Sequence, residues 1–162
     1  WNAMARKVGE IPPGMRLTFD SHSDFYLGDI GVAPFLIPHD AAEPVAYRIA
    51  CGEKKMAVAT DLGVYTDYTV EHLKGLDVLL LEANHDNLSN AACADAVIQL
   101  AQTGVKQIIL GHLSGENNLP ELALATSTQR AEQEGMILGQ DISLDLALRD
   151  TVGSVYTLRE GA

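Results

Sequence analysis

Residues 56–63 read MAVATDLG, and this stretch decides how the rest of the chain is interpreted. Five small or apolar residues lead directly to Asp61, and Gly63 follows two positions later. Such a run predicts a buried strand that delivers one carboxylate to the edge of a sheet, where the chain turns.

Three other segments have the same form. Residues 35–40, FLIPHD, are an apolar run that leads to His39, and residues 107–112, QIILGH, lead to His112. Residues 78–86, VLLLEANHD, end in a polar cluster. Buried strands that end in His, Asp or Glu predict one sheet edge that gathers metal ligands.

The remaining pattern predicts a layered α/β or α+β domain. Pro34 places the strand over 30–37 at a sheet edge or a bulge. Further strands are expected over 15–20, 45–51, 55–60, 77–82, 105–110, 143–148 and 152–158, and helices over 69–74, 89–102 and 118–134.

Composition narrows the classes of function. The 162 residues are 47% hydrophobic, which suits one globular domain with a real core. The net charge of −11 disfavours broad, non-specific binding to a polyanion. It leaves a nuclease open, because bound divalent metal ions reverse the local sign of charge.

Cys51 and Cys93 are outside any CxxC pattern and lie in apolar contexts, so both are expected to be buried free thiols in a reducing compartment. The sequence contains no apolar run of the ~20 residues that a membrane span needs. It also shows no signal-peptide pattern. A cytoplasmic protein without a membrane partner is therefore expected.

The strand-end residues themselves indicate metal chemistry. A carboxylate between histidines suits Zn²⁺, Mn²⁺ or Fe, and Asp61 could bridge two ions. Asp40 follows His39 and could orient it, while Ser114 after His112 can hydrogen-bond nearby.

At this point the sequence resembles the metallo-β-lactamase fold, and within it the YycJ/WalJ-like branch. The matching motifs are IPHDA at 37–41, PVAYRI at 44–49, AVATDLG at 57–63, LEANHD at 81–86, LSN at 88–90, GHLS at 111–114 and ENN at 116–118. The resemblance implies a four-layer αβ/βα sandwich in the parent protein. This chain would supply the C-terminal sheet and its covering helices.

The resemblance also implies a site. His39, Asp61 and His112 would be metal ligands, with Asp61 bridging and catalytic. His85 would be a second catalytic residue, placed beside the metals to protonate a leaving group or bind phosphate. Side chains expected to support these ligands or to contact substrate are Asp40, Glu82, Asp86, Ser114 and Asn117.

Two departures from the family pattern change the expectations. The HxHxDH motif of the N-terminal half is absent, so residues 1–162 are expected to form a single partial domain. Two divalent ions are then expected in the parent and one or none in this chain. The missing N-terminal half, or a second copy of this chain, is expected to cover the open sheet edge. In addition, Asp86 is followed directly by Asn87, where the family has a longer stretch.

Three functions follow as alternatives. The first is a phosphodiesterase, specifically a 5′→3′ DNA exonuclease that uses a metal-activated water, with DNA as the partner of the parent protein. The second is a metallohydrolase of small esters, thioesters or lactams. The third is a metal-poor, non-catalytic half-domain.

Overall fold

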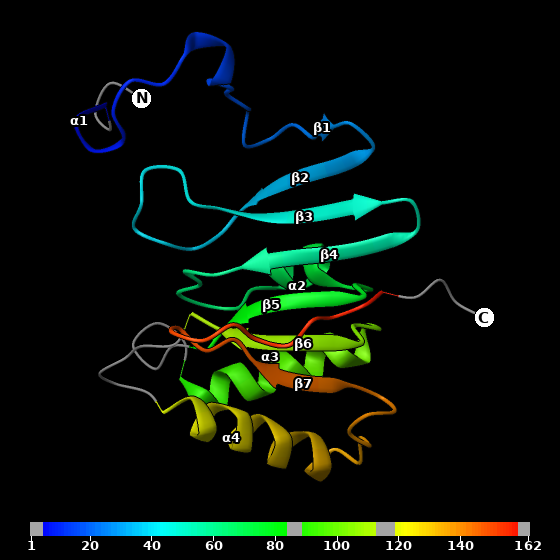
Figure 1. The fold of residues 1–162 in the computed structure, drawn as a ribbon. Helices are drawn as coiled ribbons and strands as arrows, with labels where there is room; N and C mark the ends of the chain where they lie inside the picture. The colour runs from blue at the N-terminus through cyan, green and yellow to red at the C-terminus, as the bar shows by residue number, and fades with distance from the viewer. Residues whose placement is uncertain (1–4, 84–88, 113–118, 159–162) are drawn as a thin grey trace.

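The computed structural model describes residues 5–83, 89–112 and 119–158. Within them a single seven-stranded sheet runs in chain order from β1 to β7 (Figure 1). The strands are β1 (Phe25–Leu27), β2 (Ile30–Leu36), β3 (Val45–Cys51), β4 (Lys54–Ala59), β5 (Val78–Glu82), β6 (Gln107–Gly111) and β7 (Ser143–Leu146).

Strand direction determines which strand ends lie together at the candidate site. Strands β1 to β4 pair antiparallel in succession, and β4 to β7 pair parallel. Strand β2 therefore runs in the same direction as β4, β5, β6 and β7. The carboxyl ends of these five strands meet at one edge of the sheet, on the left in Figure 1.

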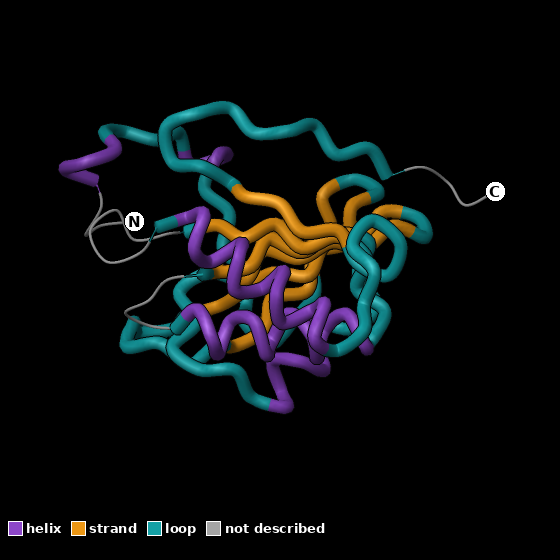
Figure 2. The backbone as a smooth tube through the Cα atoms, turned by 90° about the horizontal axis from the view of Figure 1, so that it is seen from below, coloured by secondary structure: helices purple, strands orange, loops and turns teal. Residues whose placement is uncertain are grey.

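Three helices cover one face of the sheet (Figures 1 and 2). They are α2 (Asp67–Leu73), α3 (Asn90–Gln102) and α4 (Pro120–Gln133). Alternation along β4 explains the layering, because Ala57 and Ala59 are fully buried while Met56 and Val58 are only partly buried. Ala57 and Ala59 belong to the main hydrophobic core, on the side that the helices cover.

The helix starts follow from local sequence. The Oγ1 of Thr66 accepts a hydrogen bond from Thr69 N at 3.2 Å, and the Oγ of Ser89 accepts from Ala92 N at the same distance. Pro120 is the first residue of α4. Two short elements, α1 (Ala5–Val8) and the 3₁₀ turn η1 (Pro13–Met15), precede the sheet.

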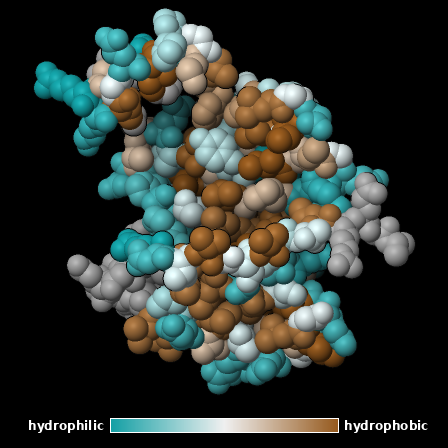
Figure 3. Space-filling model, viewed as in Figure 1, coloured by the Kyte–Doolittle hydropathy of each residue, from teal (hydrophilic) through white to brown (hydrophobic). Residues whose placement is uncertain are grey.

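The opposite face carries two irregular segments of the chain. Near β3, the ring of Phe19 stacks on Phe25 and meets Tyr47 edge-on. The C-terminal segment crosses this face in front of the last strands (Figures 1 and 2), and Tyr156 donates to Asp145 Oδ2 at 2.5 Å. Apolar side chains gather over the middle of the same face (Figure 3).

Most of the predicted elements are confirmed, including the α/β class and the strand over 30–37. Pro34 lies beyond the last residue of β2 that pairs with β1, so one side of the strand is an edge there. The strands predicted over 15–20 and 152–158 are wrong, because neither segment pairs with a strand of the sheet.

Both cysteines are free, as predicted, and Cys93 is buried. The prediction that Cys51 is buried is wrong, since it ends β3 at the hairpin and is exposed. Each helix in the described part of the chain is too short or too polar to span a lipid bilayer.

Candidate functional site

Asp61 and His112 lie in the turns that follow β4 and β6, at the shared edge of the sheet. Both have left-handed backbones, with φ of 61° and 51°, and they are the only non-glycine residues of the described chain with positive φ. Such a conformation costs roughly 1–3 kcal/mol, although Asp and His tolerate it better than most residues. Strain at two neighbouring turns is typical of a functional site.

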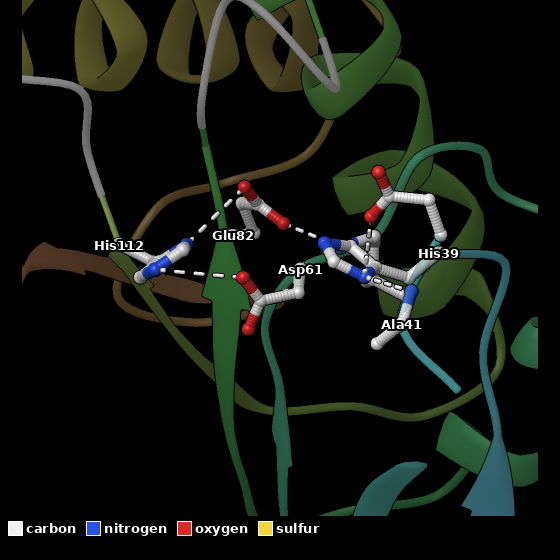
Figure 4. A network of polar contacts seen from close by, with 7 residues as sticks. His39, Ala41, Asp61, Glu82 and His112 are labelled. Carbon is white, nitrogen blue, oxygen red and sulfur yellow. Dashed lines mark hydrogen bonds and ion pairs between the residues drawn. The ribbon is translucent and has the colours of Figure 1, made fainter. Parts of the chain in front are cut away.

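These two turns bring the side chains together (Figure 4). The Nε2 atom of His112 lies 3.7 Å from Oδ1 of Asp61, and each side chain is 47% exposed. The separation is too long for a hydrogen bond. Asp61 and His112 are thus open to solvent and are not hydrogen-bonded to each other.

Glu82 is the last residue of β5, between the two turns, and its side chain is completely buried. Its Oε2 accepts from the backbone N–H of Leu62 at 2.5 Å. Its Oε1 lies 3.3 Å from Nδ1 of His112. One carboxyl group therefore contacts the turns on both sides of its strand.

His39 lies in the loop between β2 and β3. Its Nδ1 accepts a hydrogen bond from Ala41 N at 3.0 Å and lies 3.2 Å from the exposed Asp40 carboxylate. The loop is fixed to the Asp61 turn because Gly63 N donates to the carbonyl of Pro38 at 3.0 Å. In Figure 4 His39 lies on the other side of Asp61 from His112.

The Asp61–His112 pair fits a divalent ion in part. Two ligand atoms about 2.1 Å from one tetrahedral ion are about 3.4 Å apart, close to the 3.7 Å observed. His39 does not complete the set in this conformation, because its Nδ1 accepts from Ala41 and a neutral ring then carries its proton on Nε2. Among the described residues no group of three or more His, Cys, Asp or Glu side chains is arranged to hold a metal ion.

A buried polar layer lies beneath this edge. Burial raises the pKa of Tyr65 well above its usual value, with further contributions from Cys93 and Glu82. Burial also raises the pKa of the Cys93 thiol to about 12, and its Sγ donates to the Glu82 carbonyl at 3.6 Å. Within the described chain the Tyr65 hydroxyl has no hydrogen-bond partner. These groups stay protonated near neutral pH.

A cavity of about 270 Å³ lies elsewhere. Two of its lining residues are bonded to each other, since Ser21 donates to Glu43 Oε1 at 2.6 Å. The predicted site residues are absent from its lining, although Glu43 shares the 37–44 loop with His39. The lining residues are Leu17, Thr18, Phe19, Ser21, Glu43 and Val45.

Sequence reasoning thus named three residues that the fold places at one edge, and two of them face each other. It missed the Leu62 N–H, because a main-chain donor has no sequence signature. It also missed Tyr65, since nothing local marks its hydroxyl as buried. Four predicted residues lie outside the described residues: His85, Asp86, Ser114 and Asn117.

Comparison with protein families gives a match over most of the chain. The profile described as "Beta-lactamase superfamily domain" matches residues 3–113. The chain is 31% identical to Exodeoxyribonuclease YycJ of Bacillus anthracis over 86% of its own length. It is 30% identical to Exodeoxyribonuclease WalJ of Streptococcus pneumoniae D39 over 89%. It spans only 61% and 62% of these two relatives.

Solved structures show the same fold at low sequence identity. The metallo-beta-lactamase fold protein YhfI of Bacillus subtilis has a TM-score of 0.64 at 14% identity, over 81% of this chain and 51% of that one. Igni18, a metallo hydrolase of Ignicoccus hospitalis, has a TM-score of 0.61 at 14% identity, over 81% and 57%. Zn²⁺-bound PqqB of Methylobacterium extorquens has a TM-score of 0.54 at 19% identity, over 82% and 53%.

Proposed function

Because the chain belongs to the beta-lactamase superfamily, we propose that it carries part of the active site of a metal-dependent phosphodiesterase that hydrolyses DNA from a 5′ end. The observation that carries this proposal is the Asp61–His112 pair, separated by 3.7 Å at a half-exposed sheet edge. A carboxylate oxygen and an imidazole nitrogen that face each other without a hydrogen bond are suited to share a cation.

Asp61, His112 and His39 are the proposed ligands. A divalent ion supplies Lewis-acid polarisation of a phosphoryl oxygen and activates water. Asp61 and His112 need no large movement to bind it. His39 must change, because a neutral ring that accepts at Nδ1 from Ala41 carries its proton on Nε2. Ligation through Nε2 would therefore require the ring proton to move to Nδ1, and the Ala41 N–H would lose its acceptor.

The remaining residues have proposed supporting roles. His85 would donate a proton to the leaving group or bind phosphate. Asp40 stays beside His39, 3.2 Å from its ring. Asp86, Ser114 and Asn117 would contact substrate or steady the ligands.

DNA is the proposed substrate because two relatives at 30–31% identity are named exodeoxyribonucleases. The net charge of −11 does not favour a long nucleic-acid contact. Binding would therefore depend on the local positive field of the ion and on few phosphates.

The same charge favours a second candidate, hydrolysis of a small ester, thioester or lactam. Such a substrate needs no extended basic surface, and the residues at the sheet edge could bind it in the same way. The chemistry of the ion does not separate the two candidates, because it can polarise either a carbonyl or a phosphoryl oxygen.

One assay separates them. The purified protein is loaded with Zn²⁺ or Mn²⁺ and given 5′-labelled DNA or a panel of small esters. We expect nucleotide release from the labelled end, with loss of activity in Asp61→Asn and His112→Ala. His22→Ala is the matched control, because this histidine is exposed and is not among the proposed ligands. Ester hydrolysis without DNA hydrolysis would favour the second candidate. The absence of both activities would contradict both candidates and would favour the metal-poor, non-catalytic half-domain.

A further inference from the structure

Glu82 makes contacts that a residue placed only for packing would not need. It is completely buried at the end of β5, yet its two oxygens contact donors from two different turns. Leu62 N lies 2.5 Å from Oε2, and His112 Nδ1 lies 3.3 Å from Oε1 (Figure 4). Leu62 directly follows Asp61, so Glu82 contacts both the turn that carries Asp61 and the turn that carries His112.

The donors decide how the proton on His112 is placed. A backbone N–H can only donate, so Oε2 of Glu82 must accept from Leu62. Oε1 then faces Nδ1 of His112 at 3.3 Å, and we take Nδ1–H as the donor of this contact. A neutral ring then has its lone pair on Nε2, which is the atom that faces Asp61 at 3.7 Å.

The geometry points to Glu82 as a positioning residue that keeps His112 in the Nδ1–H form and fixes the Asp61 turn, so that Nε2 and Oδ1 are preset for one divalent cation. This inference rests on the proposed function only in taking the cation as the ligand. A carboxylate on the far nitrogen of a ligating histidine sets both ring orientation and ring basicity. Glu82 would thus act through His112 and need not touch substrate.

Glu82→Gln tests this directly because the two side chains have nearly the same shape. Glutamine has one acceptor oxygen and one NH₂ donor. The Leu62 N–H must keep the oxygen, so the NH₂ would face Nδ1 of His112. Nδ1 would then become the acceptor, and the ring proton would move to Nε2, between the two proposed ligand atoms.

The experiment uses the metal-free chain with ¹⁵N-labelled histidine. Long-range ¹H–¹⁵N NMR identifies which ring nitrogen carries the proton, and the His112 signals are assigned by their loss in His112→Gln. We expect Nδ1–H in the wild type and Nε2–H in Glu82→Gln. Zn²⁺ affinity by calorimetry should fall 10–100-fold in the variant, the usual effect of losing such a partner.

Glu71→Gln is the matched control, because Glu71 is an exposed glutamate on α2 that pairs only with Lys74 among the described residues. It should change neither the His112 signals nor the affinity. A wild-type ring with its proton on Nε2 would overturn the inference, even if Glu82→Gln failed to fold. A folded Glu82→Gln with unchanged tautomer and Zn²⁺ affinity would also overturn it.

These readouts are independent of catalysis. If the tautomer and the Zn²⁺ affinity behave as expected but neither DNA nor esters are hydrolysed, the proposed function fails and the role of Glu82 stands. If hydrolysis is observed and Glu82→Gln has no effect on tautomer or affinity, the reverse holds.

Discussion

Gly63 donates its backbone N–H to the carbonyl oxygen of Pro38 at 3.0 Å, and this bond joins the His39 loop to the turn that carries Asp61. The two backbones approach so closely that a Cβ on Gly63 would also lie 3.0 Å from the Pro38 oxygen. Glycine at this position is therefore a condition for bringing His39 near the other proposed ligands.

Gly63→Ala should push the His39 loop away from the Asp61 turn. We expect a loss of about 1 kcal/mol in unfolding free energy, a typical value for one core-adjacent substitution, together with weaker Zn²⁺ binding. Urea unfolding and calorimetry measure the two effects. Gly14→Ala is the control, since nothing lies within 4 Å of its added Cβ. Equal behaviour of the two variants would contradict the proposed role of the contact.

Asp61→Asn should separate ligation from folding. Asparagine tolerates the left-handed backbone that Asp61 adopts at φ of 61°. We therefore expect unfolding free energy to change by less than about 0.5 kcal/mol, while Zn²⁺ affinity falls at least about tenfold because the anionic ligand is lost. Elemental analysis of the wild-type chain should find one ion or none. Two tightly held ions would show that the ligand set is incomplete as described.

The Tyr156–Asp145 contact should make the C-terminal segment sensitive to acid. The hydrogen bond from Tyr156 is the main cause that lowers the Asp145 pKa. A lowered pKa stabilises the fold at pH values above the usual Asp pKa of ~3.9, and this contribution is lost as pH falls through the folded pKa. The effect is small, because the pair is near the surface.

Tyr156→Phe should remove this acid-dependent part of the stability, measured by urea unfolding at pH 7 and at pH 3. At pH 7 we expect a loss of up to about 1 kcal/mol, the net value of one hydrogen bond. Tyr26→Phe is the control, because Tyr26 is 74% exposed. If Tyr156→Phe and the wild type lost stability equally between the two pH values, the contact would not be the cause.

The two cysteines should differ sharply in reactivity. Burial raises the pKa of Cys93 to about 12, so almost no thiolate exists at pH 8. Cys51 is exposed. A disulfide reagent should therefore titrate one thiol per native chain and two in denaturant, and Cys51→Ser should leave none in the native chain. Rapid reaction of both native thiols would show that the α3 side of the core opens readily.

Association through an open sheet edge stays a prediction. Strand β7 pairs only with β6 among the described strands, and unpaired edges invite pairing with other chains. We expect light scattering to give a mass above the 17.4 kDa of one chain. A monomer at high concentration would contradict this expectation.

Much of the fold could be read from local pattern. The apolar runs before Asp61, Glu82 and His112 each form a strand. A short apolar run of this kind indicates a buried strand wherever it packs in the fold. Failures came from segments with strand-like composition that pack on a sheet face. The ring of Phe19 and the hydroxyl of Tyr156 each find partners there, and such partners are distant in sequence.

The sequence by itself determined which residues lie at the carboxyl ends of the strands, since a strand's last residue is fixed by where its apolar run stops. It did not determine what those residues do to one another. In the fold, His112 directs Nδ1 to the buried Glu82 and Nε2 to Asp61. This arrangement depends on strand order, on parallel register and on the left-handed backbones of Asp61 and His112. These are non-local properties, because hydrogen-bond geometry depends on ångström-scale placement of atoms that only the packed sheet provides.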